Sequence, residues 1–147
     1  MTTINLGPGA TYTLDTTKLD RILKDMPTKR DEIVAKAAFE IQDHAGKLAP
    51  VDTGALINSI FTKTFRSNAY KKSFADAQNR NPKVRPVPES EFGDVKQGEA
   101  IVGSSVEYAY WVEMGRKKGK VPARPFLGTA VEMQRDKFEK MLKELVL

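Results

Sequence analysis

The chain has 147 residues, a formal net charge of +5 and no cysteine. This length suits one domain with its own core, and the lack of cysteine excludes a disulfide framework, a zinc–thiolate site and a thiol nucleophile. No segment approaches the roughly 20 apolar residues of a membrane-spanning helix, and no basic flank precedes an apolar run at the N-terminus, so we expect a soluble protein that is not exported.

The charge is distributed in blocks along the sequence. Residues 66–85 carry six basic side chains against one acidic side chain, and residues 116–124 carry five basic side chains and no acidic one. Residues 86–115 between them carry six acidic side chains against one lysine. Such alternation indicates complementary protein patches as readily as a nucleic-acid groove. The candidate contacts in the two basic segments are Lys71, Lys72, Arg80, Lys83, Arg85, Arg116, Lys117, Lys118 and Lys120.

The first half of the chain contains the strongest helix signal. Residues 1–14 alternate weakly around a Gly-Pro-Gly turn, which predicts an arm or an edge strand, and a short helix from Thr16 or Thr17 should end at Pro27. A long amphipathic helix is predicted from Thr28 to Leu48. Its apolar residues recur at spacings of three and four, and many of them are alanines that allow close packing.

The middle of the chain predicts two strands that flank a long connection. Asp52, Thr53 and Gly54 form a cap-and-turn signal before one helical turn at 55–59, and residues 60–65 follow as a strand with Phe61 and Phe65 on one face. Periodicity then disappears over 67–98, which predicts a long basic hairpin loop that is mobile in the free subunit, since its composition supports no core. Residues 100–106 should return as a strand, antiparallel to 60–65.

The last third predicts a short aromatic helix and a long final helix. Over 108–114, Tyr108, Trp111 and Val112 form an apolar stripe, Glu107 and Glu113 fall outside it, and Gly115 suits a left-handed C-cap. The final helix should start with Pro125 at its first position and pack across the sheet beside the long helix. We expect Trp111 and Phe126 to share one buried cluster.

These elements together predict a single α+β domain over 1–147, with an antiparallel sheet packed against the long helix and the C-terminal helix. The residues offer no site for catalysis, a cofactor or a metal. His44 is interpreted as an ordinary helix-surface histidine, and Gly103 before Ser104 and Ser105 as a tight turn, because no second glycine or nearby base completes a nucleophile elbow. Gly115-Arg-Lys-Lys-Gly119 lacks the spacing of a phosphate-binding loop.

The aromatic residues and the basic segments leave alternatives open. Tyr108, Tyr110 and Trp111 resemble a base-stacking platform in composition, but Glu107 and Glu113 bracket them and would repel phosphate, which favours core packing or a part-buried interface. The basic segments fit a solvated loop, contact with the DNA backbone, or docking on an acidic protein ring.

Three ordered blocks carry a family resemblance. They are Ala49-Pro-Val-Asp-Thr-Gly-Ala-Leu-Ile-Asn-Ser-Ile60, Val102-Gly-Ser-Ser-Val-Glu-Tyr-Ala-Tyr-Trp-Val-Glu-Met-Gly115 and Ala123-Arg-Pro-Phe-Leu127. With the helices before and after them, the chain resembles the tail-completion or neck proteins of long-tailed phages, the gene-product-ten-like minor structural proteins, over about residues 15–147. It departs from them at Met114-Gly115-Arg116, where the family often has glycine followed by threonine, and in the long basic insertion at 66–99.

The resemblance implies a small α+β virion protein that completes the tail and joins it to the head, present in the host cytoplasm before assembly. Its implied partners are the neighbouring neck and tail-terminator proteins and further copies of itself in a ring, with non-specific contact to channel DNA as a further possibility. The structural or interface candidates in the three blocks are Asp52, Thr53, Gly54, Gly103, Tyr108, Trp111, Glu113, Gly115, Arg124, Pro125 and Phe126. The alternative is a DNA-binding accessory protein that uses 66–85 and 116–124.

Overall fold

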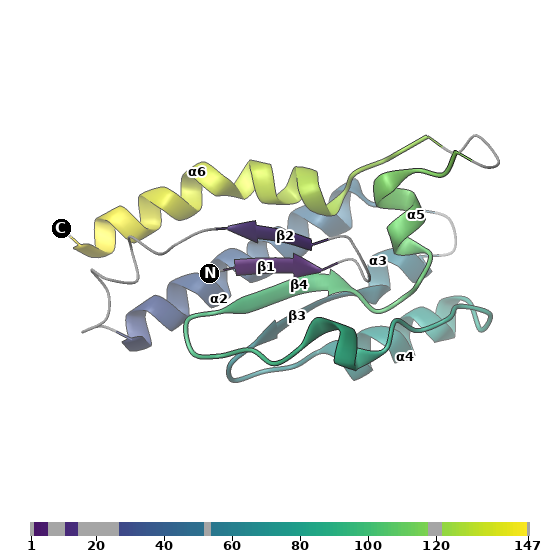
Figure 1. The fold of residues 1–147 in the computed structure, drawn as a ribbon, viewed down its shortest axis with the longest axis horizontal. Helices are drawn as coiled ribbons and strands as arrows, with labels where there is room; N and C mark the ends of the chain where they lie inside the picture. Colours follow the sequence, from purple (N-terminus) through teal and green to yellow (C-terminus); the bar gives the residue numbers. More distant parts are fainter. Residues whose placement is uncertain (1, 6–10, 15–26, 52–53, 118–121, 147) are drawn as a thin grey trace.

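The computed structural model describes residues 2–5, 11–14, 27–51, 54–117 and 122–146, and its architecture is α+β (Figure 1). One sheet contains four strands in the order β2-β1-β4-β3. They are β1 (Thr2–Asn5), β2 (Thr11–Leu14), β3 (Ile60–Thr64) and β4 (Ala100–Ser104). The predicted antiparallel pairing of β3 with β4 is confirmed, whereas β1 runs parallel to β4. The N-terminal segment, expected as an arm or an edge strand, supplies one interior strand and one edge strand.

The two faces of the sheet contribute to different clusters, because side chains alternate along a strand. Ile60, Ala100 and Val102 belong to the main core. Phe61 and Ile101 point to the opposite face and join a smaller cluster. Gly103 pairs with Phe61 inside the ladder, so its interpretation as a tight turn is wrong. Phe65, expected on the same face as Phe61, lies beyond the end of β3 and is exposed.

Two long helices cover the main-core face, as predicted. Helix α2 (Pro27–Leu48) packs on β3 and β4, and α6 (Leu127–Val146) lies along α2 (Figure 1). Ala37, Ala38 and Ala45 are buried in α2, and these small residues let the helix lie close to its neighbours. The short helix expected around 17–26 lies outside the described residues.

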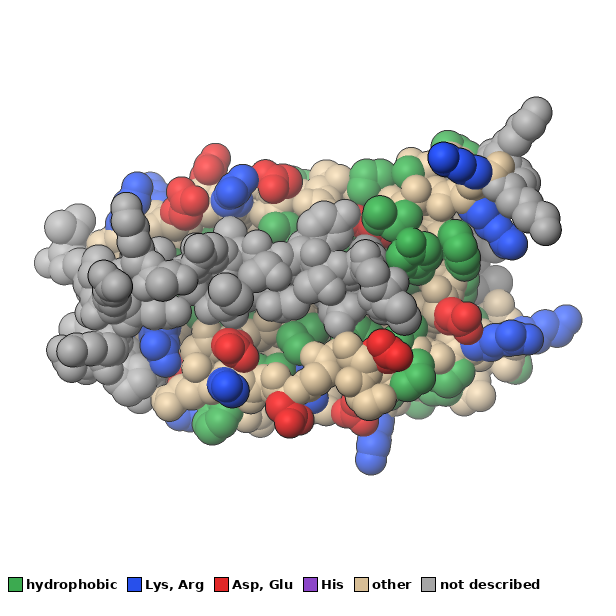
Figure 2. Space-filling view, viewed as in Figure 1, with side chains coloured by type: hydrophobic (Ala, Val, Ile, Leu, Met, Phe, Trp, Pro, Cys, Tyr) green, Lys and Arg blue, Asp and Glu red, His purple; other side chains and the backbone are tan. Residues whose placement is uncertain are grey.

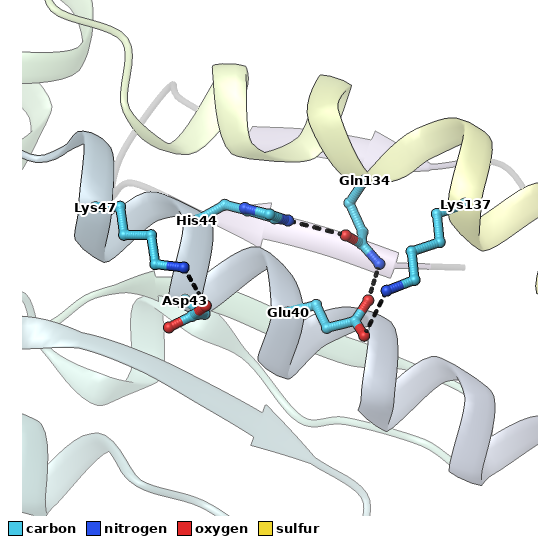
Figure 3. Close-up of polar contacts among 6 residues, drawn as sticks. All are labelled: Glu40, Asp43, His44, Lys47, Gln134 and Lys137. Carbon is cyan, nitrogen blue, oxygen red and sulfur yellow. Dashed lines mark hydrogen bonds and ion pairs between the residues drawn. The ribbon is translucent and has the colours of Figure 1, made fainter.

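A chain of polar side chains joins α2 to α6 (Figure 3). Gln134 is buried in α6, and its amide nitrogen donates to the Glu40 carboxylate. Its amide oxygen lies 3.2 Å from His44 Nε2, and Lys137 Nζ donates to Glu40 at 3.0 Å. His44 is therefore part of a contact between helices, which corrects its interpretation as a surface residue. Each buried polar atom of Gln134 has a partner, as burial requires.

The segment between β3 and β4 is not the unstructured hairpin loop that the sequence predicted. It contains helix α4 (Tyr70–Arg80) and a turn of 3-10 helix, η1 (Glu89–Phe92). The rings of Tyr70 and Phe92 each meet the Phe61 ring edge-on, and they are tilted against each other. The ring centroids are 4.9–5.9 Å apart, and the three rings lie on the second face of the sheet. The apolar residues are too far apart in the sequence to show a period, yet they converge on one sheet face. The mobility expected for 67–98 remains a prediction, but the reason given for it, the lack of a core, is wrong.

Two shorter helices lie near the C-terminal end of β4 (Figure 1). The predicted turn is confirmed as α3 (Ala55–Ser59), with Gly54 as its N-cap at φ 82°, a conformation that favours glycine. The aromatic segment forms α5 (Ala109–Met114), and Gly115 follows it with φ 76° and ψ 171°, which has the predicted positive φ but not a left-handed helical ψ. Asp52 and Thr53 lie outside the described residues.

Candidate interaction surface around helix α5

Helix α5 is held in place by a side that was expected to lie outside its packed apolar stripe. Glu113 is only 2% exposed, and Ala109, one turn earlier, is also buried. The Glu113 carboxylate accepts hydrogen bonds from the backbone N–H groups of Leu127 at 3.0 Å and Gly128 at 2.8 Å. These are the first two residues of α6, whose N–H groups have no partner inside the helix. The prediction that Glu113 is outside the packed face is therefore wrong.

The Glu113 carboxylate also explains where α6 begins. The Ala130 N–H donates to the Phe126 carbonyl at 3.2 Å, so Phe126 occupies the N-cap position. Its apolar side chain cannot cap the helix, and Glu113 takes that role from α5. Pro125 lies before the N-cap and not at the first helical position, which corrects the expected start of this helix.

The opposite side of α5 faces outward. Trp111 is 43% exposed and Met114 is 50% exposed, three residues apart on one side of the helix. Phe126 is buried in the main core, so the predicted buried cluster of Trp111 with Phe126 is wrong. The physical reason is the small side chain of Ala109, which lets that side of the helix approach the core closely and turns Trp111 away from it.

The exposed indole has two neighbours on the surface. The guanidinium carbon of Arg116 lies 5.2 Å from the centroid of the Trp111 ring, which is a cation–π geometry. The Tyr110 ring meets the indole edge-on, with centroids 4.9 Å apart. Both neighbours hold Trp111 in one orientation at the surface.

The two basic segments meet beside this tryptophan. Lys83 and Arg85 follow α4, and a bridge between Pro86 and Val106 places them next to the start of α5. Asn81, Lys83, Val84, Arg85, Glu107, Tyr108 and Trp111 line a hollow of about 290 Å³. Figure 2 shows apolar side chains, basic side chains and a carboxylate gathered at the end of the molecule that carries α5 in Figure 1.

The other candidates are placed as follows. Arg124 and Pro125 are exposed in the segment beside α5, where the Arg124 N–H donates to the Val112 carbonyl at 2.8 Å. Arg80 approaches Gly54, but Lys71 and Lys72 lie in the first turn of α4, far from the hollow. Lys118 and Lys120 lie outside the described residues. Met114 was not among the predicted interface residues. Its spacing of three residues from Trp111 places both side chains on one side of a helix and could have indicated it.

The two serines after Gly103 are engaged in packing. Ser104 and Ser105 are buried, with Ser104 Oγ 2.6 Å from Ser59 Oγ and Ser73 Oγ donating to Ser105 Oγ at 3.0 Å. Within the described ranges, no group of three or more His, Asp or Glu side chains is arranged to hold a metal ion. No helix in that part of the chain is long and apolar enough to span a membrane.

The comparisons with known proteins add no relative. No family model matches this chain, and neither a curated protein nor a solved structure matches it. The geometry of the surface and the sequence blocks are therefore the evidence on which a function is argued.

Proposed function

We propose that this protein is a non-enzymatic structural component of a tailed phage or prophage, which completes the tail and joins it to the head as a ring subunit at the neck. The observation that carries the proposal is the surface around α5, where an exposed tryptophan, an exposed methionine and two basic segments meet at one end of the domain. Tryptophan and arginine are enriched at the centres of protein interfaces. The second and third sequence blocks that resemble neck proteins contribute this helix and the segment that leads into α6.

The anchoring of α5 supports an assembly role. Glu113 and the Arg124–Val112 hydrogen bond fix the helix to α6 and to the segment before it. A binding surface on a rigid element loses little conformational entropy when a partner docks. The proposed partners are the neighbouring neck and tail-terminator proteins, and further copies of the chain within the ring.

Deletion of the gene from an inducible phage tests the proposal. The deletion should leave DNA-filled heads and separate tails visible by electron microscopy, with few joined particles, and a plasmid copy of the gene should restore joining. Infectious particles at the normal yield from the deletion strain would overturn the assignment. Empty heads would place the protein in DNA packaging instead.

A second candidate, a DNA-binding accessory protein, is favoured by the basic side chains beside Trp111. Its affinity for duplex DNA should fall steeply with salt, because each phosphate contact releases counterions. Reversal of Lys117, Lys118 and Lys120 to Glu should then abolish binding in an anisotropy titration. Salt-independent or absent DNA binding would exclude this candidate.

A further inference from the structure

We propose that the surface around α5 binds an acidic protein segment in which carboxylates flank one apolar side chain. The inference deepens the proposed function, on which it rests for its biological setting, by stating the chemistry of the partner. Three features of the surface carry it: the charge of its rim, the arrangement around the indole, and the apolar floor of the hollow.

The rim of the hollow has an excess of cations. Lys83 and Arg85 are exposed in its lining, Arg116 is exposed over the neighbouring Trp111 ring, and Glu107 is the one acid among the residues that line the hollow. Within the described part of the chain, neither Lys83 nor Arg85 is in an ion pair. Complementary charge on a partner would raise the association rate and fix its register.

The surroundings of Trp111 favour protein over nucleic acid. A base-stacking platform needs an accessible ring face, but Arg116 already covers a face of the indole and Tyr110 packs against it edge-on. The Glu107 carboxylate lies in the same hollow and would repel a phosphate backbone. A peptide can instead direct its own N–H groups to Glu107 and its carboxylates to the cations.

The hollow suits one apolar side chain. Its volume of about 290 Å³ is at the lower limit for a small-molecule pocket. Val84 is buried in the main core, and Tyr108 packs against that core, so the two residues provide an apolar floor between the charged residues. An apolar residue of the partner would be partly desolvated there beside Trp111, while the polar part of the lining would face the residues that flank it.

A second copy of the chain is a poorer fit than a different protein. Among the turns that the structure describes, η1 with the residues that follow it is acidic and carries Glu89, Glu91 and Asp94. Its aromatic residue, Phe92, is buried in the subunit's own smaller cluster. Copies of this turn can offer charge to the hollow, but they cannot offer the apolar anchor. Phe39 and Met133 are exposed apolar residues beside carboxylates, but those carboxylates are already in ion pairs: Glu40 with Lys137, Asp43 with Lys47 and Glu132 with Arg135.

The sole tryptophan of the chain lies in this surface, so its fluorescence reports directly on occupancy. The probe is a short synthetic peptide of Glu and Asp around a central Leu, with a fluorescein label for anisotropy and an unlabelled form for tryptophan fluorescence. The full-length protein should bind it saturably, and replacement of the central Leu by Ser should weaken binding about tenfold. The doubly reversed variant Lys83→Glu/Arg85→Glu should also weaken binding by at least about tenfold, the equivalent of about 1.4 kcal/mol.

A matched control separates the surface from net charge. Lys71→Glu/Lys72→Glu changes the total charge by the same amount, far from the hollow, and should alter the dissociation constant less than about threefold at moderate salt, where distant charges are screened. Circular dichroism of both variants checks that they fold. Trp111→Ala, measured with the labelled peptide, should lose affinity as the Lys83→Glu/Arg85→Glu variant does.

Three results would overturn the inference. The first is peptide binding that is absent, or equally weakened by both double variants. The second is tighter binding of a DNA duplex than of the peptide with loss in Lys83→Glu/Arg85→Glu, which would make the surface a nucleic-acid site. The third is self-association that this variant abolishes, which would make the occupant a second copy. Each result is independent of the gene deletion, which tests the neck assignment and does not depend on the peptide.

Discussion

Removal of the Glu113 carboxylate should destabilise the protein more than its position on a short helix suggests. The carboxylate accepts two backbone hydrogen bonds from the first turn of α6 while it is almost completely buried. A hydrogen bond to a charged group contributes about 1.5–3 kcal/mol, and a buried N–H that loses its partner costs about 1–3 kcal/mol. Glu113→Ala removes both bonds at once, so we expect it to lower the free energy of unfolding by about 3–5 kcal/mol.

Glu113→Gln separates charge from shape. The amide keeps the volume and one acceptor oxygen, but its NH₂ group faces a second N–H donor, and the favourable charge at the helix N-terminus is lost. We expect a loss of about 2–3 kcal/mol, between wild type and Glu113→Ala. The measurement is urea unfolding followed by circular dichroism, with the slope of the transition used to check that the unfolded state is unchanged.

Glu107→Gln is the matched control, since Glu107 is an exposed carboxylate six residues before Glu113, ahead of α5, and the substitution changes the net charge equally. It should shift stability by less than about 0.5 kcal/mol. A Glu113→Ala variant within about 1 kcal/mol of wild type would show that the carboxylate does not cap α6. The anchoring of α5, and with it the rigid surface proposed for docking, would then need another explanation.

Four further predictions follow from other parts of the fold. Trp111→Ala should cost less than about 1 kcal/mol in the same assay, because the indole is exposed, whereas Phe138→Ala in the main core should cost about 3–5 kcal/mol. Gly98→Ala and Gly93→Ala should both be destabilising because both residues have positive φ, and Gly98→Ala should cost no more than about 1 kcal/mol beyond Gly93→Ala, because the new Cβ, 2.6 Å from Arg30 Nε, meets only the end of a flexible side chain that can shift. Burial raises the pKa of Glu40, but hydrogen bonds from Lys137 and Gln134 and the charges of Lys137 and Lys36 outweigh burial, so the pKa is lowered overall. The stability that Glu40 contributes is therefore present above about pH 4.5 and lost as the pH falls through the lowered pKa. Wild type and Glu40→Gln should consequently converge in stability when both are unfolded by acid. Amide hydrogens in the last turns of α4 should exchange slowly in the isolated subunit, because Ala77 is buried in the core, and exchange as fast as in an unfolded peptide would restore the expectation of a mobile loop.

The sequence was sufficient for elements with a regular apolar period. Helix α2 was predicted because its alanines and aliphatic residues recur along one face, and the β3–β4 pair because two short apolar runs flank one connection. Helix α4 was missed because its buried residues are few and polar residues separate them. Tyr70 and Ser73 gain their burial from Phe61 on β3 and from Ser105, just after β4. Tertiary contacts of that kind leave no local pattern.

The surface around α5 was predicted in composition but not in orientation. The sequence indicated a short helix with Trp111 and flanking acids, and hydrophobicity placed the tryptophan inside and Glu113 outside. In the structure Trp111 is exposed and Glu113 is buried. Hydrogen bonds to the first turn of α6, whose own N-cap residue Phe126 cannot cap it, offset the cost of desolvating the Glu113 carboxylate. Only the packing of α5 against α6 reveals that exchange.

The parallel pairing of β1 with β4 constrains the order in which the protein can be built. Thr2 pairs with Ala100, so β1 borders on a strand that lies almost 100 residues further along the chain. Contacts between such distant residues form slowly, because a long stretch of chain must be ordered before they can be made. Until β4 has been synthesised, β1 can pair only with β2. In the complete sheet, detachment of β1 would leave one edge of β4 unpaired. Because such an edge can pair with a strand of another molecule, resistance to exchange between nascent copies depends on β1 staying paired with β4.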